Sequence, residues 1–337
     1  MSMKNLQSEG NEILAVDLGF VQTKASSTSW ETKFSSIVKP RSDVAIADMA
    51  DSEGFTLCYE GKAFSVGAKG SYDFKADRLT RESDIAKLLA VFGQYQDKTG
   101  IRIVDTLVTG LPIIEFNAYK DQLREALQRT FQFTYGSQKK VISVQNVLVI
   151  PQSAGAFYNY ILDIDGEPVD EALALEDVIT FDIGGRTSDG CIMEASRYSQ
   201  DSFTIMQGVW KAHDVLRKLI QRDFQYGLKP FEVDVVMRTG ILKLGRDEHR
   251  VDELIYKAIA SVYPEMRDEL SLSVNDFRRF AAMILVGGGA HVFHDFLAED
   301  INIPIIISEN SMDSEFANAR GYLKYAKLRA KQLQQSQ

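Results

Sequence analysis

Short apolar runs recur along the chain, and each of them ends at a glycine, a proline or a polar residue. Apolar runs of about four to eight residues are typical of buried strands. The runs that predict strands are 13–20 (ILAVDLGF), 106–112 (TLVTGLP), 146–152 (NVLVIPQ), 178–185 (VITFDIGG), 281–290 (AAMILVGGGA) and 303–308 (IPIIIS).

Between these runs, apolar residues recur at the spacing of one helix face. This pattern predicts helices over 119–131 (YKDQLREALQRTF), 211–224 (KAHDVLRKLIQRDF) and 252–263 (DELIYKAIASVY). Strands that alternate with helices predict layered α/β domains. The length of 337 residues is enough for two such domains, and the acidic stretch 162–177 (LDIDGEPVDEALALED) has the composition of a boundary between them.

Two of the predicted strands end in the same motif. Residues 16–24 read VDLGFVQTK and residues 181–190 read FDIGGRTSDG, so an Asp-x-Gly turn falls in each half of the chain. Glycines let backbone N–H groups approach an anion, and a strand-end aspartate can hold a divalent cation. An ordinary turn explains either motif alone. The repetition favours two phosphate or metal-phosphate loops that hold one ligand in the cleft between two related domains.

The composition narrows the class of protein. Hydrophobic residues make up 45% of the chain, and no apolar run approaches the length of a membrane span, about 20 residues. The first twelve residues, MSMKNLQSEGNE, lack the apolar segment of a signal peptide, and Cys58 and Cys191 are the only cysteines. Both observations predict a cytoplasmic protein. The net charge of −9 makes a broad nucleic-acid surface unexpected, so a link to DNA would run through a partner.

Two further features have competing explanations. The segment 322–331 (YLKYAKLRAK) predicts a basic amphipathic helix that lies on a membrane surface or, as we prefer, docks on its own domain. His291 and His294 are spaced to share a metal ion, but no third ligand accompanies them, and a helix surface explains them better. The last residues, 331–337 (KQLQQSQ), are expected to be frayed.

Five motifs in order along the chain resemble those of the ATPase superfamily of actin, sugar kinases and heat-shock chaperones. VDLGFVQTK resembles the first phosphate motif, VIPQSAGAFY (149–158) the first connecting segment and FDIGGRTSDG the second phosphate motif. ILVGGGAHVF (284–293) resembles the adenosine motif, and NARGYLKYA (318–326) resembles the second connecting segment. Within the superfamily the chain is most similar to the prokaryotic actin-like proteins of the ParM/StbA type and to the archaeal actin-like proteins. The segments that carry this likeness are TKFSSIVKPR (32–41), YEGKAFSVGAKG (59–70), TGLPIIEF (109–116) and DIGGRTSD (182–189).

The resemblance implies an actin-like fold, with two related α/β domains and a nucleotide cleft between them. We expect domain I to span 1–165, with 310–337 returning to it, and domain II to span 166–309. The cleft would hold ATP and Mg²⁺, with Asp17 and Asp182 as metal ligands that act mainly through water. Backbone amides of glycines, threonine hydroxyls and one lysine would bind the nucleotide. These residues are Gly19, Thr23, Lys24, Gly184, Gly185, Thr187, Gly287, Gly288 and Gly289.

Gln152 carries the most information about the reaction, because the first connecting segment faces the γ-phosphate in the superfamily. A glutamine is not a strong general base, but it can orient a water molecule through hydrogen bonds. This favours hydrolysis, with Gln152, Asp17 and Asp182 as the catalytic set. A strand-end glutamine without a catalytic role is the alternative. Asp189 either assists water or metal in the same cleft or caps the following strand.

The resemblance therefore implies an ATPase that assembles into filaments and segregates plasmid or other DNA, or positions another cargo, through a DNA-binding adaptor protein. A kinase for a sugar or acetate-like acceptor is one alternative, and Gln152 in place of an acid argues against it. A chaperone-type ATPase that does not polymerise is another, although no substrate-binding domain follows the second connecting segment. Trp210 departs from the family pattern, which has a small residue after Gly-Val. Filament contacts are expected within 30–75 and 225–280.

Overall fold

The computed structural model describes residues 12–41, 54–67, 82–307 and 311–335, and it divides into two compact units. Unit 1 comprises Met1–Val169 and Phe316–Gln337, and unit 2 comprises Asp170–Glu315. Residues 1–11 of the polar N-terminal segment, residues 68–70 of the motif 59–70 and parts of the expected contact region 30–75 lie outside the described residues.

Unit 1 contains a nine-stranded sheet in the order β3-β2-β1-β7-β9-β8-β5-β6-β4. Strand β1 pairs antiparallel with β2 and parallel with β7, and β7 pairs parallel with β9. The strands are β1 (Ile13–Leu18), β2 (Gln22–Ser26), β3 (Glu31–Ser35), β4 (Val38–Arg41), β5 (Phe55–Tyr59), β6 (Lys62–Val66), β7 (Ile103–Leu111), β8 (Thr130–Tyr135) and β9 (Gln138–Pro151).

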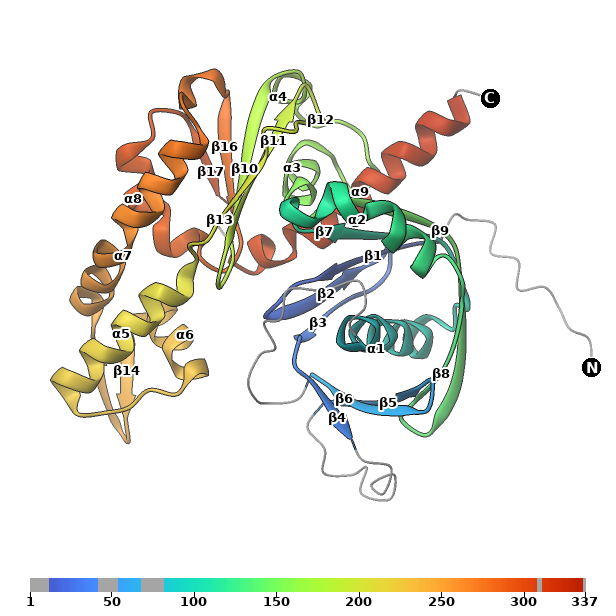
Figure 1. Cartoon of the computed structure of the whole chain (residues 1–337), viewed down its shortest axis with the longest axis horizontal. Helices are drawn as coiled ribbons and strands as arrows, with labels where there is room; N and C mark the ends of the chain where they lie inside the picture. Colours follow the sequence, from blue (N-terminus) through green and yellow to red (C-terminus); the bar gives the residue numbers. More distant parts are fainter. Residues whose placement is uncertain (1–11, 42–53, 68–81, 308–310, 336–337) are drawn as a thin grey trace, which may run out of the picture. The chain divides into compact units, whose positions relative to one another are not determined.

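The sheet of unit 1 curves around helix α1 (Glu82–Thr99), as Figure 1 shows. Leu88, Leu89, Ala90, Val91 and Phe92 occupy successive positions of the helix, and all of them are buried. An amphipathic helix buries one stripe, whereas a helix enclosed on several sides must be apolar around its circumference. Helix α1 is therefore the centre of the hydrophobic core of unit 1.

Within the described part of unit 1, the other helices are α2 (Ile113–Leu127), α3 (Ala154–Ile161) and most of α9 (Ser311–Gln335). Helix α9 packs on α3, where Lys324 Nζ donates to the carbonyl oxygen of Asn159 over 2.6 Å and the ring of Tyr325 lies 4.4 Å from that of Tyr158. This packing confirms the interpretation that we preferred for segment 322–331, a terminal helix docked on its own domain.

Unit 2 contains a second sheet in the order β12-β11-β10-β16-β17, with β13 paired to β11, and a separate hairpin of β14 and β15. Its strands are β10 (Asp177–Ile183), β11 (Ser188–Glu194), β12 (Arg197–Tyr198), β13 (Phe203–Ile205), β14 (Ile241–Leu244), β15 (Asp247–Arg250), β16 (Ala282–Val286) and β17 (Ile305–Ile307). Its helices are α4 (Glu171–Ala174), α5 (Val209–Phe224), α6 (Pro230–Thr239), α7 (Asp252–Ser273), the short 3₁₀ helix Phe277–Arg279 and α8 (Ala290–Asp300). Ile179, Phe181 and Ile183 of β10 form one core with buried residues of α5, α7 and α8.

The two sheets repeat one arrangement. In unit 1 an antiparallel hairpin, β1–β2, is followed across the sheet by the parallel strands β7 and β9. In unit 2 the hairpin β10–β11 is followed in the same way by the parallel strands β16 and β17. The predicted fold class, α/β with two related domains, is confirmed by this repetition.

Two predicted helices differ from the structure at their C-terminal ends. Helix α2 ends at Leu127, and Phe131 lies in β8, where it pairs with Ile142 of β9. The strand pairing outweighs the helical periodicity that the sequence shows there. Helix α7 continues past Pro264 to Ser273, because Met266 and Leu270 extend its buried face and compensate for the hydrogen bond that proline cannot donate.

Candidate functional site

The carboxyl ends of β1, β7 and β9 lie at one edge of the unit 1 sheet, because the three strands are parallel neighbours. Asp17 lies near the end of β1, and Gln152 directly follows β9. In α/β sheets, ligands bind at the carboxyl ends of the strands. Two residues that are far apart in the sequence are thus brought together at an edge suited to binding.

The side chains of Asp17, Lys24 and Gln152 converge at this edge. Gln152 Nε2 donates to Asp17 Oδ1 over 2.7 Å, and Lys24 Nζ lies 3.5 Å from Asp17 Oδ2. The register of β1 with β2 sets Lys24 directly opposite Asp17. The structure therefore assembles a carboxylate, a cation and an amide from three of the residues that the sequence singled out.

Asp17 is only 1% exposed. A buried carboxylate is costly unless charged or polar groups compensate for the lost water, and Lys24 and Gln152 do so here. Carboxylate oxygens are the ligands that Mg²⁺ prefers, and a lysine is a common partner of phosphate. The donor set of this cluster therefore fits a magnesium-phosphate group.

The turn between β1 and β2 requires a glycine and is held by a serine. A Cβ at Gly19 would lie 2.5 Å from the carbonyl oxygen of Gln22, so a larger residue does not fit. Ser36 Oγ donates to the carbonyl oxygen of Gly19 over 2.6 Å, and it also lies 3.0 Å from Thr23 Oγ1. Thr23 is fully buried and, by the alternation of β2, faces away from Lys24. Its hydroxyl thus belongs to the support of the turn rather than to the cluster around Asp17. Sequence reasoning missed Ser36 as a site residue, because segment 32–41 was used only for its likeness to the family and its hydroxyl residues were given no role.

The carboxyl edge of the unit 2 sheet carries the second motif. Strands β10 and β16 are parallel, and Asp182 pairs with Val286, so Gly287 follows beside Asp182. Gly287 has a φ of 87°, and a Cβ there would overlap the Asp182 carboxylate. Gly289 N donates to the carbonyl oxygen of Ile183 over 2.9 Å. The glycine run is thereby fixed against the end of β10.

The turn after β10 also depends on glycine. Gly184 N donates to the carbonyl oxygen of Thr187 over 3.0 Å, and a Cβ at Gly184 would lie 2.8 Å from that same oxygen. Gly288 differs from the other glycines at this edge of the unit 2 sheet, Gly184, Gly185, Gly287 and Gly289, because no described atom lies within 4 Å of a Cβ placed there. The backbone at Gly288 therefore borders open space, in which a ligand can approach it.

Trp210 occupies the other side of the same turn. At the start of α5, Val209 N and Trp210 N donate to the carbonyl oxygens of Gly184 (3.0 Å) and Gly185 (2.9 Å). A Cβ at Gly185 would lie 2.7 Å from the indole ring. The departure from the family pattern thus places a large ring against the turn, and the first helical N–H groups hold that turn in place.

Among three other candidates, Asp189 and His294 have neighbouring side chains as partners, and His291 lies on the surface. Asp189 accepts a hydrogen bond from Thr204 Oγ1 over 2.6 Å, and Thr204 is its pairing partner in β13. His291 is exposed on α8, and His294 Nδ1 lies 2.8 Å from Asp295 Oδ1. Among the residues that the structure describes, no group of three or more His, Cys, Asp or Glu side chains is arranged to hold a metal ion.

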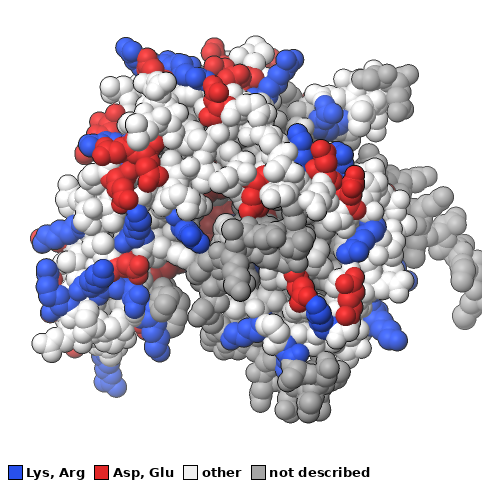
Figure 2. Space-filling model, in the orientation of Figure 1, with Lys and Arg blue, Asp and Glu red and all other residues white. Residues whose placement is uncertain are grey.

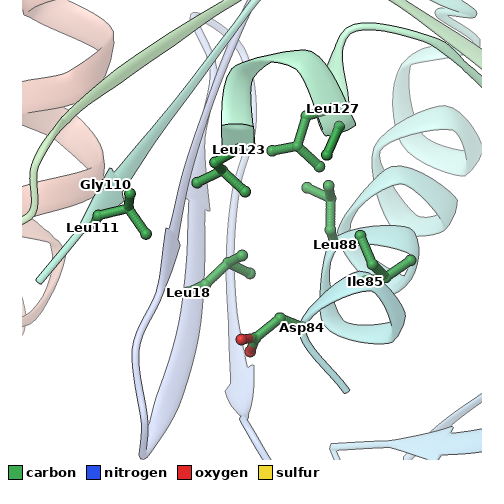
Figure 3. Close-up of a pocket in the computed structure, with 9 residues that line it drawn as sticks. Leu18, Asp84, Ile85, Leu88, Gly110, Leu111, Leu123 and Leu127 are labelled. Atoms are coloured by element: carbon green, nitrogen blue, oxygen red, sulfur yellow. The ribbon is translucent and has the colours of Figure 1, made fainter. Parts of the chain in front are cut away.

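A small pocket lies in unit 1 between α1, α2 and the ends of β1 and β7 (Figure 3). It is lined by Leu18, Asp84, Ile85, Leu88, Gly110, Leu111, Leu123, Ala126 and Leu127. Its volume of about 30 Å³ is enough for a water molecule and far too small for a nucleotide. The buried carboxylate of Asp84 is already paired with Lys87, so we assign no ligand to this pocket.

The surface gives two further observations. On the face drawn in Figure 2, lysine and arginine side chains are interspersed with aspartate and glutamate. Across the described ranges, no helix combines the length and the apolar character that crossing a membrane requires.

Two α/β units with a repeated sheet topology and a glycine-containing turn after the first strand of each define an actin-like fold. Residues 15–155 match the family of actin-like protein N-terminal domains, and residues 180–299 match the C-terminal domain of the archaeal MreB-like actin homologues. The chain therefore belongs to the actin-like proteins and carries both of these domains.

Solved structures agree with this assignment. The archaeal actin homologue Ta0583 has a TM-score of 0.76 at 18% identity, over 95% of this chain and 99% of its own. The actin-like protein Alp7A has a TM-score of 0.79 at 16% identity, over 96% and 98% of the two chains. A 15-stranded ParM filament from Clostridium botulinum has a TM-score of 0.67 at 20% identity, over 94% and 99%. Ta0583 has also been solved in complex with ADP, with a TM-score of 0.69 at 18% identity over 94% and 99%. No curated protein sequence matches the chain.

Proposed function

We propose that this protein is an actin-like ATPase that binds ATP with Mg²⁺, hydrolyses it and assembles into filaments. The cluster of Asp17, Lys24 and Gln152 at the carboxyl edge of the unit 1 sheet is the observation that carries the proposal. The nucleotide-bound and filamentous states of similar proteins support it. We further propose that the filaments segregate plasmid or other DNA, or position another cargo, through an adaptor protein.

Each residue of the cluster has a role in this proposal. Lys24 places its ammonium group against the phosphates, and Asp17 holds the magnesium ion, mainly through water. Gln152 donates through Nε2 to Asp17, which leaves its Oε1 atom to accept a hydrogen bond from the attacking water. The amide orients this water without acting as a strong base, which suits hydrolysis.

In unit 2, we assign Asp182 to the metal and the turn Gly184–Thr187 to the phosphates. Gly185 and Thr187 would supply a backbone and a hydroxyl donor there, whereas Gly184 N already donates to the carbonyl oxygen of Thr187 and so keeps the turn closed. The glycine run 287–289 would lie against adenine and ribose, because a residue without a side chain lets the backbone approach a flat ligand. Gly288, which borders open space, is the member of this run best placed for that contact.

The test is a comparison of Gln152→Ala with Gln145→Ala, which removes an exposed glutamine from β9, the strand that Gln152 follows. Phosphate release, nucleotide affinity and sedimentation would be measured for both variants and the parent protein. We expect Gln152→Ala to bind ATP normally but to hydrolyse it about 100-fold more slowly, the usual cost of losing one positioned catalytic group. Its filaments should persist longer, because ATP stays intact in them. Gln145→Ala should behave like the parent.

Two results would contradict the proposal. If affinity falls as much as the rate, Gln152 has a structural role and the catalytic assignment is wrong. A parent protein that stays monomeric with ATP at every concentration and phosphorylates a sugar or acetate-like acceptor is a kinase.

A further inference from the structure

Tyr322 of α9 contacts the backbone of Gln152. Its side chain is fully buried, and its hydroxyl donates to the carbonyl oxygen of Gln152 over 3.0 Å. The two residues are 170 positions apart in the sequence. The C-terminal helix thus supplies a direct hydrogen bond to the residue that we propose orients water.

Three glycines make room for this contact. A Cβ at Gly110 would overlap the Tyr322 hydroxyl, and a Cβ at Gly155 would lie 2.5 Å from the Tyr322 ring. A Cβ at Gly321 would overlap the carbonyl oxygen of Gly155, so α3 and α9 approach each other closely at this crossing. Glycines in β7, α3 and α9 therefore shape one space that the tyrosine fills.

Among the described residues, the backbone of Gln152 forms no other hydrogen bond with α9. Gln152 N donates to the carbonyl oxygen of Leu111 over 2.8 Å, and the Gln152 carbonyl oxygen also accepts a hydrogen bond of 3.2 Å from Gly155 N. These two bonds tie Gln152 to β7 and to the first turn of α3. The Tyr322 hydroxyl adds a third bond, which fixes the peptide group that follows Gln152.

We propose that Tyr322 is a positioning residue for Gln152, and that its hydroxyl sets the direction in which the Gln152 side chain points. The inference rests on the proposed role of Gln152 in hydrolysis. The Tyr322 side chain is fully buried and its hydroxyl bonds to a backbone oxygen, so we assign it no contact with the nucleotide. It acts on the rate through the backbone of Gln152, so its removal should change kcat and leave nucleotide affinity unchanged.

The experiment compares Tyr322→Phe, which keeps the ring and removes the hydroxyl, with Tyr325→Phe. Tyr325 lies on the same helix and its ring packs against that of Tyr158, so its variant controls for the loss of a hydroxyl from α9. We expect Tyr322→Phe to lower kcat about three- to tenfold, the effect of one ordinary hydrogen bond, with nucleotide affinity unchanged. In the nucleotide-free protein, backbone amides around residues 150–157 should exchange with deuterium faster than in the parent. Tyr325→Phe should change neither quantity.

A double variant separates this role from a merely structural one. If Tyr322 acts through Gln152, then Tyr322→Phe should lower the rate no further when Gln152 is already alanine. Independent, multiplicative losses would overturn the inference, as would a normal kcat in Tyr322→Phe while Gln152→Ala is slow. A parent protein without hydrolysis would instead refute the proposed function. The exchange measurement would still decide whether the hydroxyl holds the Gln152 segment.

Discussion

Replacing Gly288 with alanine separates a glycine that the fold requires from one that a ligand requires. No described atom lies within 4 Å of the added methyl group, and the backbone of Gly288 is not in the left-handed region. We therefore expect the free energy of unfolding of the nucleotide-free protein to change by less than about 0.5 kcal/mol. If adenosine packs against this backbone, the methyl group enters its space, at a cost of about 1–3 kcal/mol. That cost corresponds to a rise in the ATP dissociation constant of about five- to 150-fold.

The assay pairs thermal unfolding without nucleotide with ATP titration by calorimetry. Gly289→Ala is the matched variant, because a Cβ at Gly289 would overlap Ile183 and should lower stability even without a ligand. Gly227→Ala is a control in the same unit, where the added Cβ meets only the flexible end of Gln221 at 3.2 Å. An unchanged ATP affinity in Gly288→Ala would refute the placement of adenosine at this glycine. A lower melting temperature of the nucleotide-free variant would refute the steric reasoning.

Two further predictions concern charge. Asp17→Ala and Asp182→Ala should each weaken binding of Mg-ATP and abolish phosphate release, because each removes a carboxylate assigned to the metal, and normal turnover in both would remove the nucleotide assignment. Burial lowers the pKa of His213 below its ordinary value, a change that Arg238 reinforces and that Asp234 and Asp214 oppose. Below a pH of about 6.5, His213 therefore binds a proton in the unfolded chain but not in the folded protein. The free energy of unfolding should then fall as the pH is lowered from about 7 to about 5. Over that range the melting temperature of His213→Gln should decline less than that of the parent.

The sequence predicted the elements that local patterns control. The apolar strands around Asp17 and Asp182 were recognisable because buried parallel strands are uniformly apolar. The end of α2 was not, because Phe131 has helical spacing and becomes part of a strand only through its pairing with β9. A pairing between two strands cannot be predicted from the spacing of apolar residues within one segment.

The candidate site shows the same limit. Asp17, Lys24 and Gln152 could be chosen by motif, and the structure brings them together. Thr23 belongs to the same motif, yet the alternation of β2 turns its hydroxyl to Ser36. Tyr322 belongs to the motif NARGYLKYA, but its hydroxyl bonds to the backbone carbonyl oxygen of Gln152. Every residue has a backbone carbonyl, so the sequence does not indicate which one accepts this hydrogen bond.

The return of α9 to unit 1 has a consequence for how the protein forms. Residues 316–335 are translated after the whole of unit 2, yet the buried space beside Gly110 and Gly155 is filled only when Tyr322 arrives. During synthesis, this part of the unit 1 core therefore stays open while unit 2 is translated. Contacts between such distant segments slow folding and prolong the exposure of apolar surface. The time that the nascent chain remains prone to aggregation is therefore set by how fast α9 docks.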